Sequence, residues 1–138
     1  MGLQKILLQQ HVGTLCQAVV NVGDKVKKGS LIAKPTGLGA NIFSSVYGEV
    51  KEITKDAIII KKDENQTEEF IKLEGEDKFQ LIKDAGIVGM GGAGFPTSVK
   101  IGTKVKYILV NAAECEPLLH HNIDQIIEKT DMTIRGLK

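Results

Sequence analysis

A glycine-rich run at residues 85–97 has the composition of an anion-binding loop. It reads AGIVGMGGAGFPT, and its centre consists of Gly89, Met90, Gly91, Gly92, Ala93 and Gly94. Glycines at this density let successive backbone N–H groups converge on one anion without interference from side chains. A helix that starts near Pro96 would add the positive end of its dipole. A flexible turn is equally rich in glycine, and no Walker Lys-Ser or Lys-Thr pair follows, so the run alone leaves a phosphate cradle and a plain turn equally open.

A second set of polar residues follows the apolar run KYILV at residues 106–110. This run is typical of a buried strand, and the next residues, NAAECEP, include Asn111, Glu114 and Glu116. Ligands of open α/β sheets bind outside the carboxyl ends of the strands. We therefore expect the amide and the carboxylates to accept hydrogen bonds from a ribityl chain, a ribose or a ring N–H. The alternative is a turn with a solvated acidic corner.

The elements before these motifs predict an all-β module over residues 1–75. Short β-branched runs at residues 18–20, 25–26, 31–33, 49–53 and 57–60 are separated by glycine turns. This spacing is typical of a barrel or sandwich. The charged stretch at residues 61–69 predicts a solvated loop. The segments VGDKVKKGSLIA (residues 22–33) and SSVYGEV (residues 44–50) resemble those of the biotinyl/lipoyl-like barrel-sandwich hybrid family.

Lys34 is the one lysine between these two segments, where carriers of that family attach their cofactor at an exposed hairpin tip. Pro35 follows it directly, a loop with Gly37 and Gly39 replaces the expected tight hairpin, and neither an MKM nor a DKA motif is present. We therefore favour a structural or docking module over a lipoyl or biotinyl carrier.

Residues 76–138 predict the start of a Rossmann-like α/β domain. The glycine cluster, a short helix, the strand at 106–110 and a helix near 122–129 follow one another. A last helix is expected to begin at Thr130 or Asp131, either of which can cap it. One strand and a few short helices cannot close a core of useful size, so we expect this domain to be incomplete.

The composition excludes several classes of function. Basic and acidic residues nearly balance, 18 against 17, and this leaves no strong positive field for nucleic-acid binding. The absence of a long apolar run or a signal-peptide core predicts a cytoplasmic location. Cys16 and Cys115 have no CxxC or histidine-spaced partner, so neither a disulfide framework nor a zinc site is expected. We expect Cys16 to be a small core residue and His11 to orient the start of the β module by a backbone hydrogen bond.

The block GMGGAGFPTSVK at residues 89–100, followed by NAAECEP at 111–117, resembles the FMN- and NADH-binding 51 kDa subunit of respiratory complex I and its relatives. The preceding barrel-sandwich module, the ECEP form and the opening QHVG resemble the RnfC component of Rnf electron-transport complexes. Among RnfC-like proteins, the resemblance is strongest to those associated with proline reductase (PrdC). It covers essentially all 138 residues.

This resemblance implies an NADH-linked electron-transfer flavoprotein subunit. FMN would lie on the loop formed by Gly89, Gly91, Gly92, Ala93 and Gly94. Lys100 would lie nearby, and Asn111, Glu114 and Cys115 would lie along the flavin. Met90 stands where the complex I proteins carry an arginine, so the phosphate charge would depend more on backbone amides and on Lys100. Electrons would pass from NADH through 4Fe-4S clusters held by a missing C-terminal part to proline reductase or to an Rnf-type complex on the cytoplasmic face of the membrane.

The same resemblance implies that the chain is an N-terminal piece of a larger protein and is inactive by itself. A UGA selenocysteine codon read as stop after Lys138 is one hypothesis for its end, and sequencing of the gene downstream tests it. A docking module without flavin is the alternative function.

Overall fold

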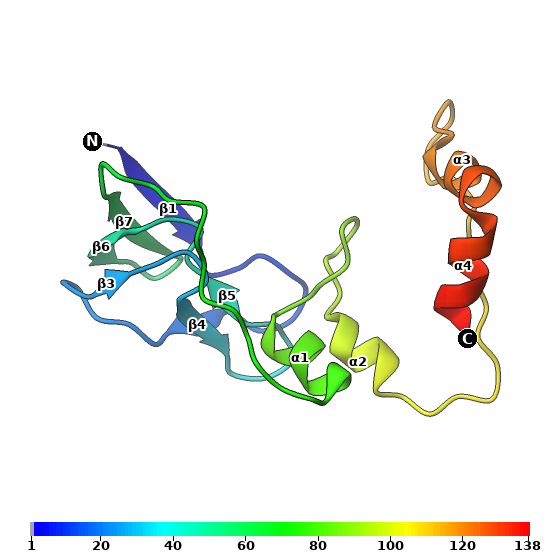
Figure 1. The fold of residues 1–138 in the computed structure, drawn as a ribbon, viewed down its shortest axis with the longest axis horizontal. Coiled ribbons are helices and arrows are strands. Elements are labelled where there is room, and N and C mark those ends of the chain that lie inside the picture. Colours follow the sequence, from blue (N-terminus) through cyan, green and yellow to red (C-terminus); the bar gives the residue numbers. More distant parts are fainter. Residues whose placement is uncertain (1) are drawn as a thin grey trace. The chain divides into compact units, whose positions relative to one another are not determined.

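The computed structural model describes residues 2–138 and contains two compact units, Met1–Thr103 and Lys104–Lys138 (Figure 1). The first unit carries two antiparallel sheets. The four-stranded sheet has the order β1 (Leu3–Leu7), β7 (Ala57–Lys62), β6 (Gly48–Ile53) and β3 (Lys25–Val26). The three-stranded sheet has the order β2 (Cys16–Ala18), β4 (Leu31–Pro35) and β5 (Ile42–Phe43).

The expected β runs correspond to strands β2, β3, β4, β6 and β7. The glycine turns between them have a conformational reason, because Gly23 (φ 95°) and Gly29 (φ 82°) adopt positive φ values that favour glycine. Strands β1 and β5 were not recognised in the sequence. β5 is only two residues long, and β1 alternates polar and apolar residues weakly, so neither carries a strong pattern.

The core of this unit lies between the two sheets. Ile58 and Ile60 of β7 and Val50 of β6 cluster with Ile32 and Ala33 of β4, and all five are fully buried. Cys16 of β2 is also buried in this cluster, as expected. Both sheets are open at their edges within residues 2–138, so the barrel-sandwich expectation holds for the layered core but not for a closed barrel.

Two short helices and the glycine run complete the first unit. Helix α1 (Lys78–Asp84), which was not predicted, begins after Asp77, whose carboxylate accepts a hydrogen bond from the Phe79 N–H at 2.9 Å. Helix α2 (Thr97–Ile101) begins directly after Pro96, as expected. The end of α1 is joined to the β sheets, because the Asn41 side-chain amide donates to the Asp84 carbonyl at 2.9 Å.

The second unit consists of an extended segment and the helices α3 (His121–Glu128) and α4 (Thr130–Leu137). Both helices were expected, but the cap was not correct: the Thr130 hydroxyl donates back to the Ile126 carbonyl of α3 at 2.6 Å, and Lys129 occupies the N-cap position without a side-chain bond. No helix in residues 2–138 is long and apolar enough to cross a membrane.

The predicted strand at residues 106–110 is wrong. These residues form no strand, and Tyr107, Ile108 and Leu109 are exposed. An apolar run becomes a strand only when a neighbouring strand satisfies its backbone groups, and the described residues of this unit provide none. The Rossmann-like start is accordingly not present as a sheet in this structure.

Truncation of the core tests the two-sheet arrangement. Ile32→Ala shortens a fully buried side chain of the core cluster, and we expect it to lower the free energy of unfolding by about 2–5 kcal/mol. Leu3→Ala, at a position that is 68% exposed, is the control and should change it by less than about 0.5 kcal/mol. Urea unfolding monitored by circular dichroism measures both, and equal effects would contradict this core.

Candidate functional site

The glycine loop, defined as residues 89–94, is closed at its base like a small hairpin. Val88 and Pro96 form an antiparallel bridge, the Gly89 N–H donates to the Phe95 carbonyl at 2.9 Å, and the Thr97 N–H donates to the Ile87 carbonyl at 2.9 Å. Gly92 (φ 59°) and Gly94 (φ 62°) adopt left-handed backbone conformations. A residue with a Cβ is strained there, so the sequence needs glycine at both positions.

The loop forms one wall of an open hollow of about 540 Å³. The other wall is the segment Gln10, His11 and Val12, which follows β1. The two walls are joined by a hydrogen bond of 2.8 Å from the Val12 N–H to the Ala93 carbonyl. The hollow therefore belongs to both the β module and the glycine loop within the first compact unit.

The backbone N–H groups of the loop are free to bind a ligand. Among the hydrogen bonds of residues 2–138, none uses the N–H of Met90, Gly91, Gly92 or Ala93 as donor. Consecutive free N–H groups in a glycine-rich turn form a concave positive surface that suits an anion. This arrangement is the nest of donors that the sequence predicted for a phosphate.

Gly91 gives an independent indication of a ligand. Its φ is not in the left-handed region, and a Cβ built on it would meet no heavy atom within 4 Å. Neither conformation nor packing within the chain requires glycine here. Glycine is expected at such a position where another molecule approaches the backbone closely.

Lys100 does not line the hollow. It lies on α2, and its Nζ is 5.9 Å from the centroid of the Phe95 ring, at the outer limit of a cation–π contact. The Met90 side chain is fully exposed, and no Lys, Arg, Asp or Glu belongs to the lining. An anion in the hollow would therefore be held by backbone donors rather than by Lys100.

The remaining predicted residues, Asn111, Glu114 and Cys115, belong to the second unit. The Asn111 Oδ1 accepts a hydrogen bond from the Ala113 N–H at 2.9 Å and forms a local turn. Cys115 is exposed. The structure thus brings the five predicted loop residues together in one hollow, whereas these three lie in a separate body.

Glu114 has a structural role that was not foreseen. Its Oε1 accepts hydrogen bonds from the N–H groups of Asn122 (2.7 Å) and Ile123 (3.2 Å), two of the free donors in the first turn of α3. Its Oε2 lies 3.3 Å from the Nδ1 of His121 but is buried without a hydrogen bond. A carboxylate several residues before a helix gives no local capping signal, so sequence reasoning could not assign this contact.

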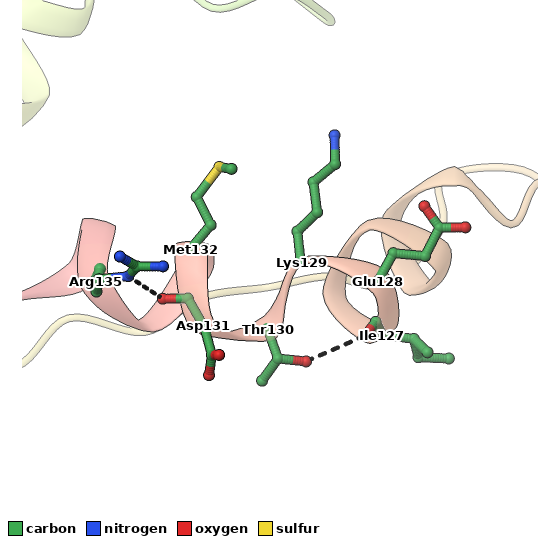
Figure 2. A pocket seen from close by; sticks show the side chains of 7 residues that line it. All are labelled: Ile127, Glu128, Lys129, Thr130, Asp131, Met132 and Arg135. Carbon is green, nitrogen blue, oxygen red and sulfur yellow. Dashed lines mark hydrogen bonds between the residues drawn. The ribbon is translucent and has the colours of Figure 1, made fainter.

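Two further features bear on the alternative functions. Lys34 lies in β4, paired with Gln17 of β2, and not at a hairpin tip where a carrier lysine is presented. A second hollow of about 350 Å³ lies at the junction of α3 and α4 (Figure 2). The hydrogen bonds drawn there, from Thr130 to Ile127 and from Arg135 to Asp131, are contacts of the helices with themselves. None of the residues predicted to bind a ligand lines it.

Comparison with known families divides the chain near the end of the β module. Residues 4–76 match the RnfC barrel-sandwich hybrid domain, and residues 82–138 match the Nuo51 FMN-binding domain. The second match begins within α1, although α1, the glycine loop and α2 belong to the first compact unit.

Curated relatives agree with this pattern over most of the chain. The RnfC-type component of the proton-translocating ferredoxin:NAD(+) oxidoreductase complex from Clostridium ljungdahlii is 36% identical over 96% of this chain and 34% of its own length. The corresponding components of ion-translocating oxidoreductase complexes from Haemophilus influenzae and Rhodobacter capsulatus are 32% and 35% identical, over 96% and 86% of this chain and 19% and 27% of their own lengths. The chain therefore spans about a third or less of these relatives.

Removal of the Glu114 carboxylate should loosen the start of α3. Glu114→Ala leaves the N–H groups of Asn122 and Ile123 without acceptors, and a lost cap of this kind costs about 0.5–2 kcal/mol. Hydrogen exchange followed by NMR should show faster exchange at these two amides. Glu116→Ala is the matched control, and equal exchange in the two variants would refute the cap.

The two cysteines should differ in reactivity. Burial raises the pKa of the Cys16 thiol above its ordinary value, so less thiolate is present and access is blocked, whereas Cys115 is exposed. A thiol reagent at mildly alkaline pH should modify Cys115 rapidly and Cys16 only after unfolding, as measured by intact mass and peptide mapping. Rapid modification of Cys16 in the folded chain would contradict its place in the core.

Proposed function

Because the chain belongs to the RnfC barrel-sandwich hybrid family, we propose that it supplies the β module and the phosphate-binding loop of an NADH-linked flavoprotein subunit that transfers electrons. The observation that carries the proposal is the row of free backbone N–H groups at Met90, Gly91, Gly92 and Ala93, in a segment that matches an FMN-binding domain. The whole protein's activity is part of this proposal, since the relatives are about three times longer or more.

The donor set of the hollow fits the phosphate of FMN. A phosphate oxygen accepts several hydrogen bonds, and the loop offers several N–H groups without side chains that would block a close approach. The loop would hold the phosphate, and Asn111, Glu114 and Cys115 are proposed to lie along the flavin. FMN and NADH together supply the conversion of a two-electron hydride transfer into single-electron steps. The residues of this chain bind and orient; none is proposed to be catalytic.

The electron acceptor is proposed to be the rest of an Rnf-type complex, with this protein on the cytoplasmic face of the membrane. The relatives' names support this choice, since one belongs to a ferredoxin:NAD(+) oxidoreductase complex and others to ion-translocating oxidoreductase complexes. Proline reductase is the second candidate acceptor, and it depends only on the resemblance of the sequence to PrdC-type proteins.

Iron–sulfur clusters would be bound by other parts of such a flavoprotein. A Cys₄ cluster needs four cysteines in reach of one another, whereas this chain has two, and one of them is buried in the core. No group of three or more His, Cys, Asp or Glu side chains suited to a metal ion occurs within residues 2–138.

A docking module without flavin is the second candidate. The observation in its favour is the absence of any lysine or arginine from the lining of the hollow, which leaves a bound phosphate without a charged partner. A lipoyl or biotinyl carrier is disfavoured, because Lys34 is held in the middle of a sheet.

Substitution of Gly91 separates these candidates. Gly91→Ala places a methyl group in open space with an allowed backbone, so the free energy of unfolding should stay equal or rise slightly. The methyl group would intrude where the phosphate approaches, and we expect the affinity for inorganic phosphate and FMN to fall by about tenfold, the value of one good hydrogen bond. Titration of the ¹⁵N-labelled chain, followed at the amides of residues 90–93, measures this loss.

Gly136→Ala is the matched control, because it also adds a methyl group in open space, on helix α4. It should leave phosphate binding unchanged. If the unchanged chain shows no shift at residues 90–93 with phosphate or FMN, the docking module replaces the flavoprotein proposal. Retention of FMN through gel filtration by a longer chain alone would support a site completed by other segments.

A further inference from the structure

His11 is buried at the point where the β module meets the glycine loop. Its side chain is 8% exposed, its Nδ1 lies 3.0 Å from the Val12 carbonyl oxygen, and its Nε2 lies 3.1 Å from the Ala40 backbone nitrogen. The sequence predicted only that His11 makes a backbone hydrogen bond. The observed contacts are more extensive, since they join the segment after β1 to the loop between β4 and β5.

The hydrogen-bond partners define the tautomer of this ring. The Ala40 N–H points at Nε2, so Nε2 is the unprotonated acceptor, and the ring proton is on Nδ1, facing the Val12 carbonyl. The Ala40 carbonyl oxygen also lies 3.2 Å from Nε2, but the Cys16 thiol, 3.4 Å from that oxygen, can donate to it instead. In this state the neutral imidazole uses both nitrogens.

The ring is tightly enclosed. A Cβ built on Gly39 would lie 2.6 Å from the His11 Cε1, so glycine at this position makes room for the imidazole. The backbone of the same segment is fixed as well, because the Gln9 side chain donates to the His11 carbonyl at 2.6 Å and the Gln10 side chain donates to the Leu7 carbonyl at 2.9 Å. His11 therefore stands in a rigid part of the β module.

The glycine loop rests on this rigid segment. The Val12 N–H donates to the Ala93 carbonyl at 2.8 Å. A Cβ built on Gly94 would lie 3.4 Å from both the Gln10 carbonyl oxygen and the His11 Cα, which is ordinary van der Waals contact. Val12 is thus bound at its carbonyl by the imidazole and at its N–H by the loop.

We infer that His11 is a positioning residue of the glycine loop: by bonding Ala40 and Val12 in its Nδ1–H form, it presents the Val12 N–H to Ala93 and keeps the N–H groups of residues 90–93 turned toward the hollow. This inference deepens the proposed phosphate-binding function and rests on it. The β module is accordingly a wall of the anion site, and its histidine sets the shape of the loop without touching the ligand.

The test uses the full 138-residue chain, ¹⁵N-labelled, with inorganic phosphate as the probe. His11→Phe keeps a ring of similar size but removes both hydrogen bonds, and we expect weaker phosphate binding by about tenfold together with faster hydrogen exchange at the Val12 amide. His11→Gln places an amide oxygen near the former Nε2 and should restore part of both. His120→Phe, at an exposed histidine, is the matched control and should change neither.

The outcomes separate this inference from the proposed function. If the unchanged chain binds no phosphate, the proposed function fails, whereas faster Val12 exchange in His11→Phe would still support the positioning role. Equal phosphate binding and equal Val12 exchange in His11→Phe and the unchanged chain would overturn it. If His11→Phe does not fold, a long-range ¹H–¹⁵N spectrum of the unchanged protein decides: a bare Nε2 supports the inference, and a protonated Nε2 overturns it.

Discussion

The hydrogen bond from Val12 to Ala93 is the contact on which the glycine loop depends. A loop that keeps the N–H groups of residues 90–93 unpaired gains no internal stabilisation from them, so its shape must be imposed from outside. The bridge between Val88 and Pro96 closes the base of the loop, and the Val12 N–H holds its far side. Because both supports come from packed elements, the donors can stay exposed without collapse of the turn into ordinary local hydrogen bonds.

The boundary between sequence families does not coincide with the boundary between compact units. The FMN-binding match begins at residue 82, whereas the first unit extends to Thr103. The contacts of Asn41 with the end of α1, and of Gly94 with His11, explain the difference, since they attach the start of the second family segment to the β sheets. A segment that is assigned to one domain by descent can therefore be held in shape by the preceding one.

Local patterns in the sequence predicted most of the first unit and less of the second. Glycine turns and β-branched runs located β2, β3, β4, β6 and β7, and the glycine-rich run located the candidate loop, because these features are encoded within a few residues. The strand at 106–110 failed because pairing partners, not composition alone, make a strand. The positions of Lys100 and Glu114, and the wall formed by Gln10 to Val12, depend on contacts between distant segments that no local pattern reveals.

The neutral lining of the hollow has a consequence for how a ligand would arrive. With no charged side chain around the loop, attraction for an anion comes from peptide dipoles, whose field falls off over a few ångströms. Encounter would then be ordinary diffusion rather than long-range steering, and the ionic strength of the cell would have little influence on its rate. Selectivity would come from the fit of the main chain around the ligand, so side chains at positions such as Met90 are free to vary through evolution.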